Sequence, residues 1–198
     1  MSVRKEIPVY DGIFFITFTN ARWLRLFEIS NAYDSVYKWF DHLKAKGHYI
    51  VGYVIMPNHV HLLIGFRNTQ GQSINRIIAE GKRFMAYDIV KRLKAGKQLN
   101  ILSLLKSYVN RREASCGKIH KVFEPSFDWK ECMTTHFITQ KLDYIHNNPC
   151  QGKWDLAKHP TEYVHSSALY YATGLQGMYP VTSFAELDDI DLTKPQID

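Results

Sequence analysis

The sequence lacks the features that define three large classes of protein. It has three cysteines in 198 residues, and Cys116, Cys132 and Cys150 are widely spaced with no CxxC pair, which argues against a disulfide framework and a cysteine-rich zinc site. No apolar run approaches the roughly 20 residues that a membrane-spanning helix requires, and residues 1–6 lack the apolar stretch of a signal peptide. There is also no internal repeat and no low-complexity segment. We therefore expect a soluble, cytoplasmic protein without a membrane partner.

The composition is that of a chain that folds around one core. Hydrophobic residues make up 45% and charged residues 22% of the sequence, both close to the averages for globular domains. A length of 198 residues is enough for one substantial core and short for two. We therefore predict a single domain over residues 1–175, followed by an acidic, loop-rich tail over residues 176–198 that we expect to be partly disordered.

Positive charge is concentrated in the middle of the chain. The formal net charge is +6, and the last fourteen residues carry five acidic residues against one lysine, so their −4 leaves +10 on the remainder. Between Arg67 and Lys121 there are thirteen lysine and arginine residues against three acidic residues. Such a basic segment is typical of proteins that bind a polyanion, and nucleic acid is the natural partner. The alternative is a solvated basic surface with no ligand, which is common among small proteins.

The first half of the chain predicts a strand, a helix and a hairpin. Residues Gly12–Thr19 are aromatic and β-branched, as in a buried strand, and residues 33–46 carry apolar side chains every three or four positions, as in an amphipathic helix. Residues 48–56 and His59–Phe66 are two apolar runs separated by a Pro-Asn dipeptide, which favours a turn between antiparallel strands. This order is the first half of a ferredoxin-like arrangement.

The second half predicts mainly helices. Residues 73–94 have the pattern of a basic amphipathic helix, and residues 99–112 that of a further helix with a basic polar side. Residues 118–129 mix β-branched and aromatic residues with a proline, which indicates irregular extended structure with an edge strand. Residues 165–171 favour a short helix.

A His-x-His motif lies in the second strand of the predicted hairpin. His59 and His61 flank Val60, and because side chains alternate along a strand, both imidazoles project from one face. Two neutral imidazoles so placed can share one divalent ion. The alternative is a pair of strand histidines satisfied by hydrogen bonds, which is the commoner explanation for an isolated His-x-His.

A predicted helix between Thr134 and Pro149 carries a tyrosine and an asparagine on one face. Tyr144 and Asn148 are four residues apart, and Lys141 shares their face. An adjacent apolar stripe would hold this face beside the sheet; it consists of Ile138, Leu142 and Ile145. A phenol near a metal ion can act as a nucleophile. The alternative is a tyrosine packed at a helix boundary.

Three motifs in the sequence resemble those of one family. The REP-associated tyrosine transposases, insertion-sequence-like members of the single-tyrosine HUH superfamily, have two signature motifs that resemble residues 56–63 (MPNHVHLL) and 144–149 (YIHNNP). A Pro-x-x-Tyr-x-x-Ser-Ser stretch of that family is similar to residues 160–167 (PTEYVHSS). The order and separation of the motifs also fit. The similarity runs from about Gly12 to Tyr171.

The resemblance implies an α+β fold and a metal site. The fold is a ferredoxin-like or RNA-recognition-like antiparallel sheet with helices packed on one face, the His-x-His on a central strand and the tyrosine helix beside it. The ion of that family is Mg²⁺ or Mn²⁺. By position in the motifs, its ligands here are His59, His61 and Asn148. Helical geometry directs His146 away from Tyr144, so we leave it out of the site.

The resemblance also implies an activity. Tyr144 is the nucleophile of a metal-dependent endonuclease and strand transferase that acts on single-stranded, hairpin or palindromic DNA. It forms a 5′-phosphotyrosine link and frees a 3′-hydroxyl that can reverse the step. Basic residues would hold the folded DNA. The candidates are Arg76, Lys82, Arg83, Lys91, Arg92, Lys106, Arg111, Arg112 and Lys141.

Two other functions and one departure from the family pattern stay open. A catalytically silent protein that binds structured DNA needs the basic surface alone, and a metal-dependent phosphoesterase would use water in place of the tyrosine. Family members often carry a Glu-His pair ahead of the tyrosine helix, where this chain has residues 127–132 (FDWKEC). The active unit is a monomer or a homodimer, and we favour the monomer.

Overall fold

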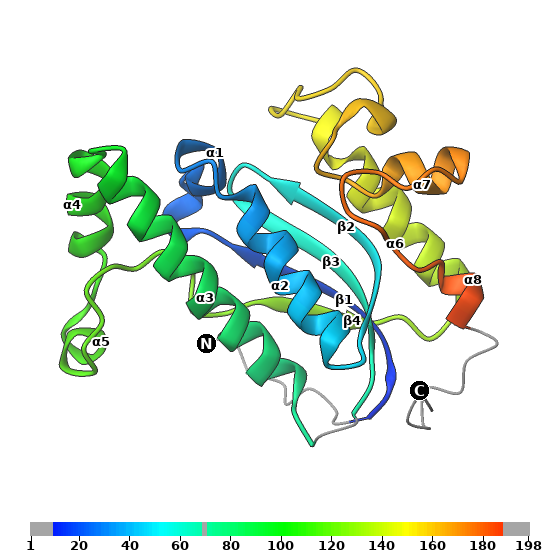
Figure 1. Ribbon diagram of the computed structural model, residues 1–198, viewed down its shortest axis with the longest axis horizontal. Helices are drawn as coiled ribbons and strands as arrows, with labels where there is room; N and C mark the ends of the chain where they lie inside the picture. The colour runs from blue at the N-terminus through cyan, green and yellow to red at the C-terminus, as the bar shows by residue number, and fades with distance from the viewer. Residues whose placement is uncertain (1–9, 69–70, 188–198) are drawn as a thin grey trace.

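A four-stranded antiparallel sheet forms the centre of the fold. The computed structural model describes residues 10–68 and 71–187. The strand order is β2-β3-β1-β4, and all neighbouring pairs are antiparallel. The strands are β1 (Gly12–Thr19), β2 (Tyr49–Met56), β3 (His59–Phe66) and β4 (Asp128–Glu131). With helices between β1 and β2 and between β3 and β4, this is the ferredoxin-like pattern, and the predicted α+β class is confirmed (Figure 1).

The central strand β3 pairs with β2 on one side and with β1 on the other. The predicted β2–β3 hairpin is therefore confirmed. In the β1 pairing, His61 lies opposite Thr17. The hairpin turn is held from outside, because the backbone N–H of Asn20 donates to the carbonyl of Asn58 at 2.8 Å. All residues of β3 are buried, so both faces of this strand are covered.

Two helices that the sequence predicted cover one face of the sheet, which we call the first face. These are α2 (Tyr33–Ala45) and α3 (Ile74–Ala95), and the Ser73 side chain caps α3. Gly81 of α3 allows a close approach to α2, because a Cβ at this position would overlap the indole of Trp39. From β3, this core receives Val60, Leu62, Ile64 and Phe66.

The second face of the sheet is covered by α6 (Thr135–Asn147). Its predicted apolar stripe is buried against residues of β1, β2 and β3. Gly52 of β2 allows the helix to approach, because a Cβ there would lie 2.5 Å from the Leu142 side chain. The expectation that helices pack on one face only is therefore wrong. Successive residues of β2 are apolar and buried, so both faces of the sheet require cover.

The prediction of a single helix over residues 99–112 is wrong. The structure has α4 (Leu99–Ser107) and α5 (Arg111–Ser115), separated at residues 108–110. The Asn110 side chain accepts a hydrogen bond from the N–H of Glu113 at 2.8 Å, and the Glu113 carboxylate accepts from the N–H of Asn110 at 3.2 Å. This capping box starts a new helix. Figure 1 shows α4 and α5 at the end of the molecule away from α6.

The remaining segments are short. Residues 118–127 contain no helix or strand, and the predicted edge strand is β4, which pairs with β1. The tail predicted from residue 176 begins by packing on the domain, since Tyr179 and Val181 are buried in the first core. We predicted that this tail is partly disordered. Residues 188–198 of the tail lie outside the described residues. The short helices are η1 (Ala21–Trp23), α1 (Leu26–Ile29), η2 (Asn148–Cys150), η3 (Pro160–Glu162), α7 (Ala168–Thr173) and α8 (Phe184–Leu187).

Among the helices of residues 10–68 and 71–187, none combines the length and the apolar character needed to cross a bilayer.

Candidate active site

The two histidines of the His-x-His motif face one another. Nε2 of His59 and Nε2 of His61 are 3.0 Å apart, and the planes of the two rings differ by 84°. Both residues are almost fully buried, at 5% and 4% exposure. Val60 between them points into the core on the other side of the sheet. The alternation of a strand therefore brings two ring nitrogens to one point.

Hydrogen bonds at the outer nitrogens orient the two imidazoles. The Nδ2 of Asn58 donates to the carbonyl of Trp23 at 3.1 Å, so its Oδ1 faces Nδ1 of His59 at 2.6 Å and accepts a hydrogen from it. Nδ1 of His61 lies 2.6 Å from the hydroxyl oxygen of Thr17. The Thr17 hydroxyl can either donate to Nδ1 of His61 or accept from it. When the hydroxyl donates, the ring hydrogen of His61 is on Nε2 and points at the Nε2 lone pair of His59, 3.0 Å away.

Burial keeps both imidazoles neutral. Burial, with a smaller contribution from the Lys153 ammonium group, lowers the pKa of His59 to about 4. Burial also lowers the pKa of His61 well below its usual value, helped by His59 and Lys141. A neutral imidazole is the form that binds a metal ion. A cation bound by both Nε2 atoms would take the place of the hydrogen bond between them.

The two nitrogens are close enough together to share one divalent ion. Mg²⁺ binds its ligands at about 2.0–2.1 Å in an octahedron, which separates neighbouring ligand atoms by about 3.0 Å. The observed separation of the Nε2 atoms is 3.0 Å, so both can reach one divalent ion.

Asn148 is positioned beside this pair. Its Nδ2 is 3.2 Å from Nε2 of His61, and half a turn of the amide would present its oxygen instead. Within residues 10–68 and 71–187, no group of three or more His, Cys, Asp or Glu side chains is placed to hold a metal ion. An ion between the two histidines would therefore take the Asn148 amide, water or substrate oxygens as its further ligands.

Tyr144 projects from α6 beside His61. The two ring centroids are 5.3 Å apart and meet edge-on at 73°. Phe15 of β1 contacts both rings, since it stacks on His61 at 5.5 Å and meets Tyr144 edge-on at 6.0 Å. Tyr144 is 51% exposed, and its hydroxyl makes no hydrogen bond to a described residue. The structure thus brings an accessible phenol and the two buried imidazoles together.

Lys141 is the predicted DNA-binding residue that lies in this site. Its Nζ is 4.9 Å from the ring centroids of Phe15 and Phe137 and 5.9 Å from that of Tyr144. Among the described residues, Lys141 has no acidic partner. Its charge is therefore available to a phosphate group bound next to the tyrosine.

Sequence reasoning missed three residues that position this site. Thr17 and Phe15 lie on the same face of β1, and Asn58 was interpreted as a turn residue only. The register of β1 against β3 places Thr17 opposite His61. Thr17 is also a polar residue in a largely aromatic strand. Together, these two features could have revealed its contact with His61.

Most of the predicted DNA-binding residues lie away from Tyr144. Helices α4 and α5 carry three of them at the far end of the molecule (Figure 1). On α3, Arg92 pairs with Asp34 and Asp88, each at 2.7 Å, and these carboxylates offset its positive charge. A role for these residues in binding DNA remains a prediction. Those on α3 are Arg76, Lys82, Arg83, Lys91 and Arg92, and those on α4 and α5 are Lys106, Arg111 and Arg112.

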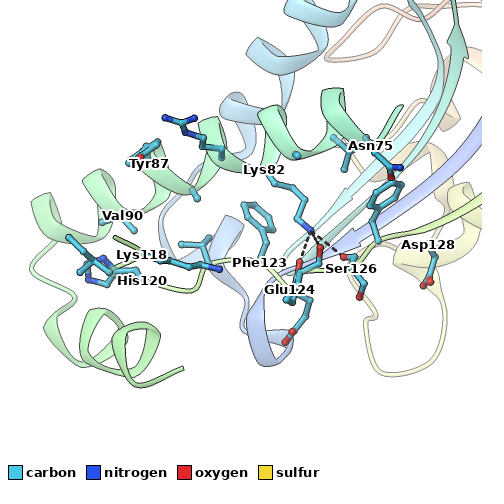
Figure 2. Close-up of a pocket in the computed structure, with 18 of the residues that line it drawn as sticks. Asn75, Lys82, Tyr87, Val90, Lys118, His120, Phe123, Glu124, Ser126 and Asp128 are labelled. Carbon is cyan, nitrogen blue, oxygen red and sulfur yellow. Dashed lines mark hydrogen bonds between the residues drawn. The ribbon is translucent and has the colours of Figure 1, made fainter. Parts of the chain in front are cut away.

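A groove of about 1240 Å³ runs between α3 and residues 117–130. Lys82 spans it, because its ammonium group donates to the carbonyls of Glu124 at 2.5 Å and Ser126 at 3.2 Å (Figure 2). Burial lowers the pKa of Lys82 to about 8. Lys82 therefore ties this loop to α3. None of the four predicted catalytic and metal-binding residues lines the groove.

The third motif, residues 160–167, forms hydrogen bonds along the outer edge of β2. The Ser167 N–H donates to the carbonyl of Tyr53 at 3.0 Å, and Ser167 Oγ accepts from the N–H of Tyr53 at 2.9 Å. The Tyr163 hydroxyl donates to the carbonyl of Ile55 at 2.8 Å. His146 contacts the same segment, because its Nε2 is 2.8 Å from Ser167 Oγ. It therefore faces away from the histidine pair, as helical geometry predicted.

The fold and the site define an α+β protein in which a His-x-His pair on a central strand meets a tyrosine on a flanking helix. A REP-associated tyrosine transposase, solved bound to a REP hairpin, has the same fold: the TM-score is 0.58 over 100% of both chains, at 16% identity. A candidate transposase from Deinococcus radiodurans has a TM-score of 0.40 and 18% identity, covering 74% of this chain and 96% of its own. No protein-family model and no curated protein matches the sequence. The chain therefore has the fold of a REP-associated tyrosine transposase.

Proposed function

We propose that this chain is a REP-associated tyrosine transposase, a metal-dependent enzyme that nicks and joins single-stranded DNA. One observation carries the proposal. The exposed ring of Tyr144 lies 5.3 Å from the ring of His61, whose Nε2 is 3.0 Å from that of His59. These residues belong to the two motifs that resemble this family. The fold shared with a hairpin-bound transposase supports the same assignment.

Tyr144 is the nucleophile of the proposed reaction. Its phenol oxygen attacks the phosphorus of a phosphodiester and loses its proton. A bond forms between that oxygen and phosphorus, and the bond from phosphorus to the 3′-oxygen breaks. The 5′-phosphate stays on the tyrosine, and the 3′-oxygen takes up a proton. Because the phosphodiester energy is conserved in this link, the 3′-hydroxyl can attack it and rejoin the strand without ATP.

The other residues of the site bind and orient. The histidine pair would hold Mg²⁺ or Mn²⁺ with Asn148 as the third protein ligand. When bound, the ion withdraws charge from the scissile phosphate. Thr17 and Asn58 hold the imidazoles through their Nδ1 atoms, so that both Nε2 atoms point to one position. Lys141 supplies positive charge on the tyrosine side of the site.

The proposed substrate is a DNA hairpin with single-stranded flanks. The similar transposase was solved with a REP hairpin, and the basic side chains of α3, α4 and α5 would hold the folded DNA through its phosphates. A single copy of the chain brings Tyr144 to the histidine pair. This arrangement supports a monomer as the active unit.

The test is formation of a covalent adduct. The protein would be incubated with Mn²⁺ and a library of DNA hairpins with randomised single-stranded flanks, and adducts that survive denaturing electrophoresis would be isolated. We expect an adduct with the natural sequence, none with Tyr144→Phe, and none in EDTA. Tyr87→Phe is the matched control, because Tyr87 is also an exposed helical tyrosine, at 68%, but lies on α3. It should form the adduct normally.

Three results would contradict this proposal. An adduct that survives Tyr144→Phe removes Tyr144 from the role of nucleophile. Tight, salt-sensitive hairpin binding without any cleavage in Mn²⁺ would indicate a catalytically silent protein that binds structured DNA. Cleavage with no protein attached to the DNA would indicate a phosphoesterase that uses water.

A further inference from the structure

Two tryptophans that the proposed chemistry does not use lie against His59. Trp23, at the end of η1, and Trp154, in the loop after η2, each have a ring centroid 5.9 Å from that of His59. Trp23 is 60% exposed, and Trp154 is half-buried. Two large aromatic surfaces from distant parts of the sequence therefore border the proposed metal site.

The backbone holds Trp23 outward in a strained turn. Arg22 and Trp23 have φ values of 53° and 60°, in the left-handed region that non-glycine residues rarely adopt. Asn58 donates to the carbonyl of Trp23 at 3.1 Å, and Glu124 accepts from the N–H of Arg22 at 2.8 Å. Asn58 also accepts from the ring of His59. One side chain therefore ties the position of the exposed indole to that of the imidazole.

Positive groups lie over the two indoles. Nζ of Lys153 is 5.9 Å from the ring centroid of Trp23 and 5.4 Å from that of Trp154. The guanidinium of Arg25 is 5.9 Å from the ring of Trp154 and pairs with Glu28 at 2.7 Å. Lys153 is exposed and has no acidic partner among the described residues. Its charge is therefore free to bind an anion beside the indoles.

This combination is suited to an unpaired nucleotide. A nucleobase stacks on an aromatic ring, and lysine or arginine neutralises the phosphate attached to it. A base inside a duplex has both faces covered by its neighbours, so it offers no face to an indole. A sugar ring would also stack on tryptophan but carries no charge for Lys153 to bind. The ligand chemistry indicated is therefore an aromatic base with a phosphate attached, in a single strand.

We propose that Trp23 and Trp154 bind an unpaired base of the DNA strand next to the scissile phosphate, with Lys153 on the phosphate of that nucleotide. This inference rests on the proposed function, since it assigns the tryptophans to the substrate of the same site. Stacking tolerates every base. The subsite therefore requires that a base is present rather than a particular one, and it positions the single-stranded flank of the hairpin at Tyr144.

The experiment separates binding from chemistry. All proteins carry Tyr144→Phe and are kept in EDTA, and dissociation constants are measured by fluorescence anisotropy. Three probes share one DNA hairpin: the first has short flanks of unpaired thymidines, the second has abasic residues in those flanks, and the third is blunt. We expect Trp23→Ala to weaken binding of the thymidine-flanked hairpin roughly tenfold, and to leave the abasic and blunt probes unchanged.

Companion variants keep the result interpretable. Trp154→Leu retains apolar bulk in a half-buried position and removes the aromatic face, so it should show the same probe-specific loss. Trp23→Tyr retains a stacking surface and should restore most of the affinity. Tyr87→Ala removes an equally exposed aromatic that lies beside Arg83, at 5.9 Å, on α3. It should leave the preference for the thymidine flank unchanged.

The outcomes separate this inference from the proposed function. No loss with Trp23→Ala, or an equal loss on all three probes, overturns the inference. If the natural sequence forms no adduct in Mn²⁺ while the probe-specific loss appears, the inference stands and the proposed function fails. If adducts form and their half-saturating DNA concentration is the same in Trp23→Ala, the function stands and the inference fails.

Discussion

The two faces of β3 come from alternating residues of one strand and meet different surroundings. Toward α2 and α3, Val60, Leu62 and Ile64 enter a closed core of aliphatic and aromatic side chains. Toward α6, the strand places His59 and His61 beside the exposed Tyr144. The first face is apolar throughout, whereas the second face holds polar ring nitrogens in a buried position.

This difference shows how the central strand tolerates a buried pair of histidines. A buried polar group is costly unless it has a hydrogen-bonding partner, and both outer nitrogens have one, in Thr17 and Asn58. The two inner nitrogens are within hydrogen-bond distance of each other, at 3.0 Å. We infer that the first face supplies most of the stability, and that the second face is arranged for a metal ion and a substrate.

The largest expected effect comes from truncating one residue on each face. His61→Ala should lower the rate of adduct formation more than about a thousandfold, because it removes a proposed metal ligand, with a smaller loss in the free energy of unfolding than Leu62→Ala causes. Leu62→Ala should lower that free energy by about 2–5 kcal/mol, with an unchanged rate per folded molecule. Urea denaturation and single-turnover adduct kinetics measure the two quantities. A similar loss of stability in both variants would break the comparison.

Two glycines offer a second comparison between the faces. Gly52→Val should displace α6, because the new side chain would overlap Leu142, and we expect a roughly hundredfold slower adduct rate from misplacement of Tyr144. Gly81→Ala should instead lower the free energy of unfolding by about 1–2 kcal/mol, since its Cβ would overlap the Trp39 indole. Its adduct rate per folded molecule should stay normal. If Gly81→Ala were the slower enzyme, the assignment of the two faces would be reversed.

A buried histidine outside the pair, His48, makes the free energy of unfolding depend on pH. His48 stacks on Phe66 at 4.9 Å, and burial, together with the charges of Lys46 and Arg67, lowers its pKa to about 4. The unfolded chain binds its proton near pH 6.5 and the folded chain near pH 4, so this stability is complete above pH 6.5 and is lost as pH falls toward 4. Between pH 7 and pH 5 the loss is about 2 kcal/mol.

Urea denaturation at the two pH values checks this contribution. His48→Gln has no imidazole to protonate, so its free energy of unfolding should fall by about 2 kcal/mol less than that of the natural sequence. An identical pH dependence in the two proteins would show that His48 does not titrate in this range.

The smallest expected effect comes from an isosteric change beside the histidine pair. Thr17→Val removes the hydroxyl 2.6 Å from Nδ1 of His61 and keeps the shape of the side chain. Metal affinity should fall roughly tenfold, because the imidazole loses the partner that orients it. A Mn²⁺ titration followed by electron paramagnetic resonance measures this. Thr173→Val changes an exposed threonine of α7; it is the control and should bind Mn²⁺ normally.

The elements that could be predicted from sequence are those with a strong periodic pattern. The strand Gly12–Thr19 and the helix that ends before Pro149 have the expected limits. The break at residues 108–110 was missed because helical periodicity continues across it, and the capping box at Asn110 decides the structure locally. The cover on the second face was missed because apolar runs in β2 and β3 do not show which helix covers which side.

The candidate site was predictable where its residues share short motifs. His59 and His61 are two positions apart, and Tyr144 and Asn148 are one helical turn apart. Residues that join the site through strand register or through loops were not predictable. Thr17 reaches His61 because β1 pairs with β3, and the indoles reach His59 from two turns whose paths have no periodic pattern.

The central claim is that two buried imidazoles beside an accessible tyrosine hold a divalent ion. Crystals soaked in Mn²⁺ and measured at a wavelength that gives an anomalous signal from manganese test it directly. We expect an anomalous peak about 2.1 Å from Nε2 of both His59 and His61, on the side that faces Tyr144 and Asn148. Manganese bound elsewhere, with the two Nε2 atoms still in contact at 3.0 Å, would contradict the account.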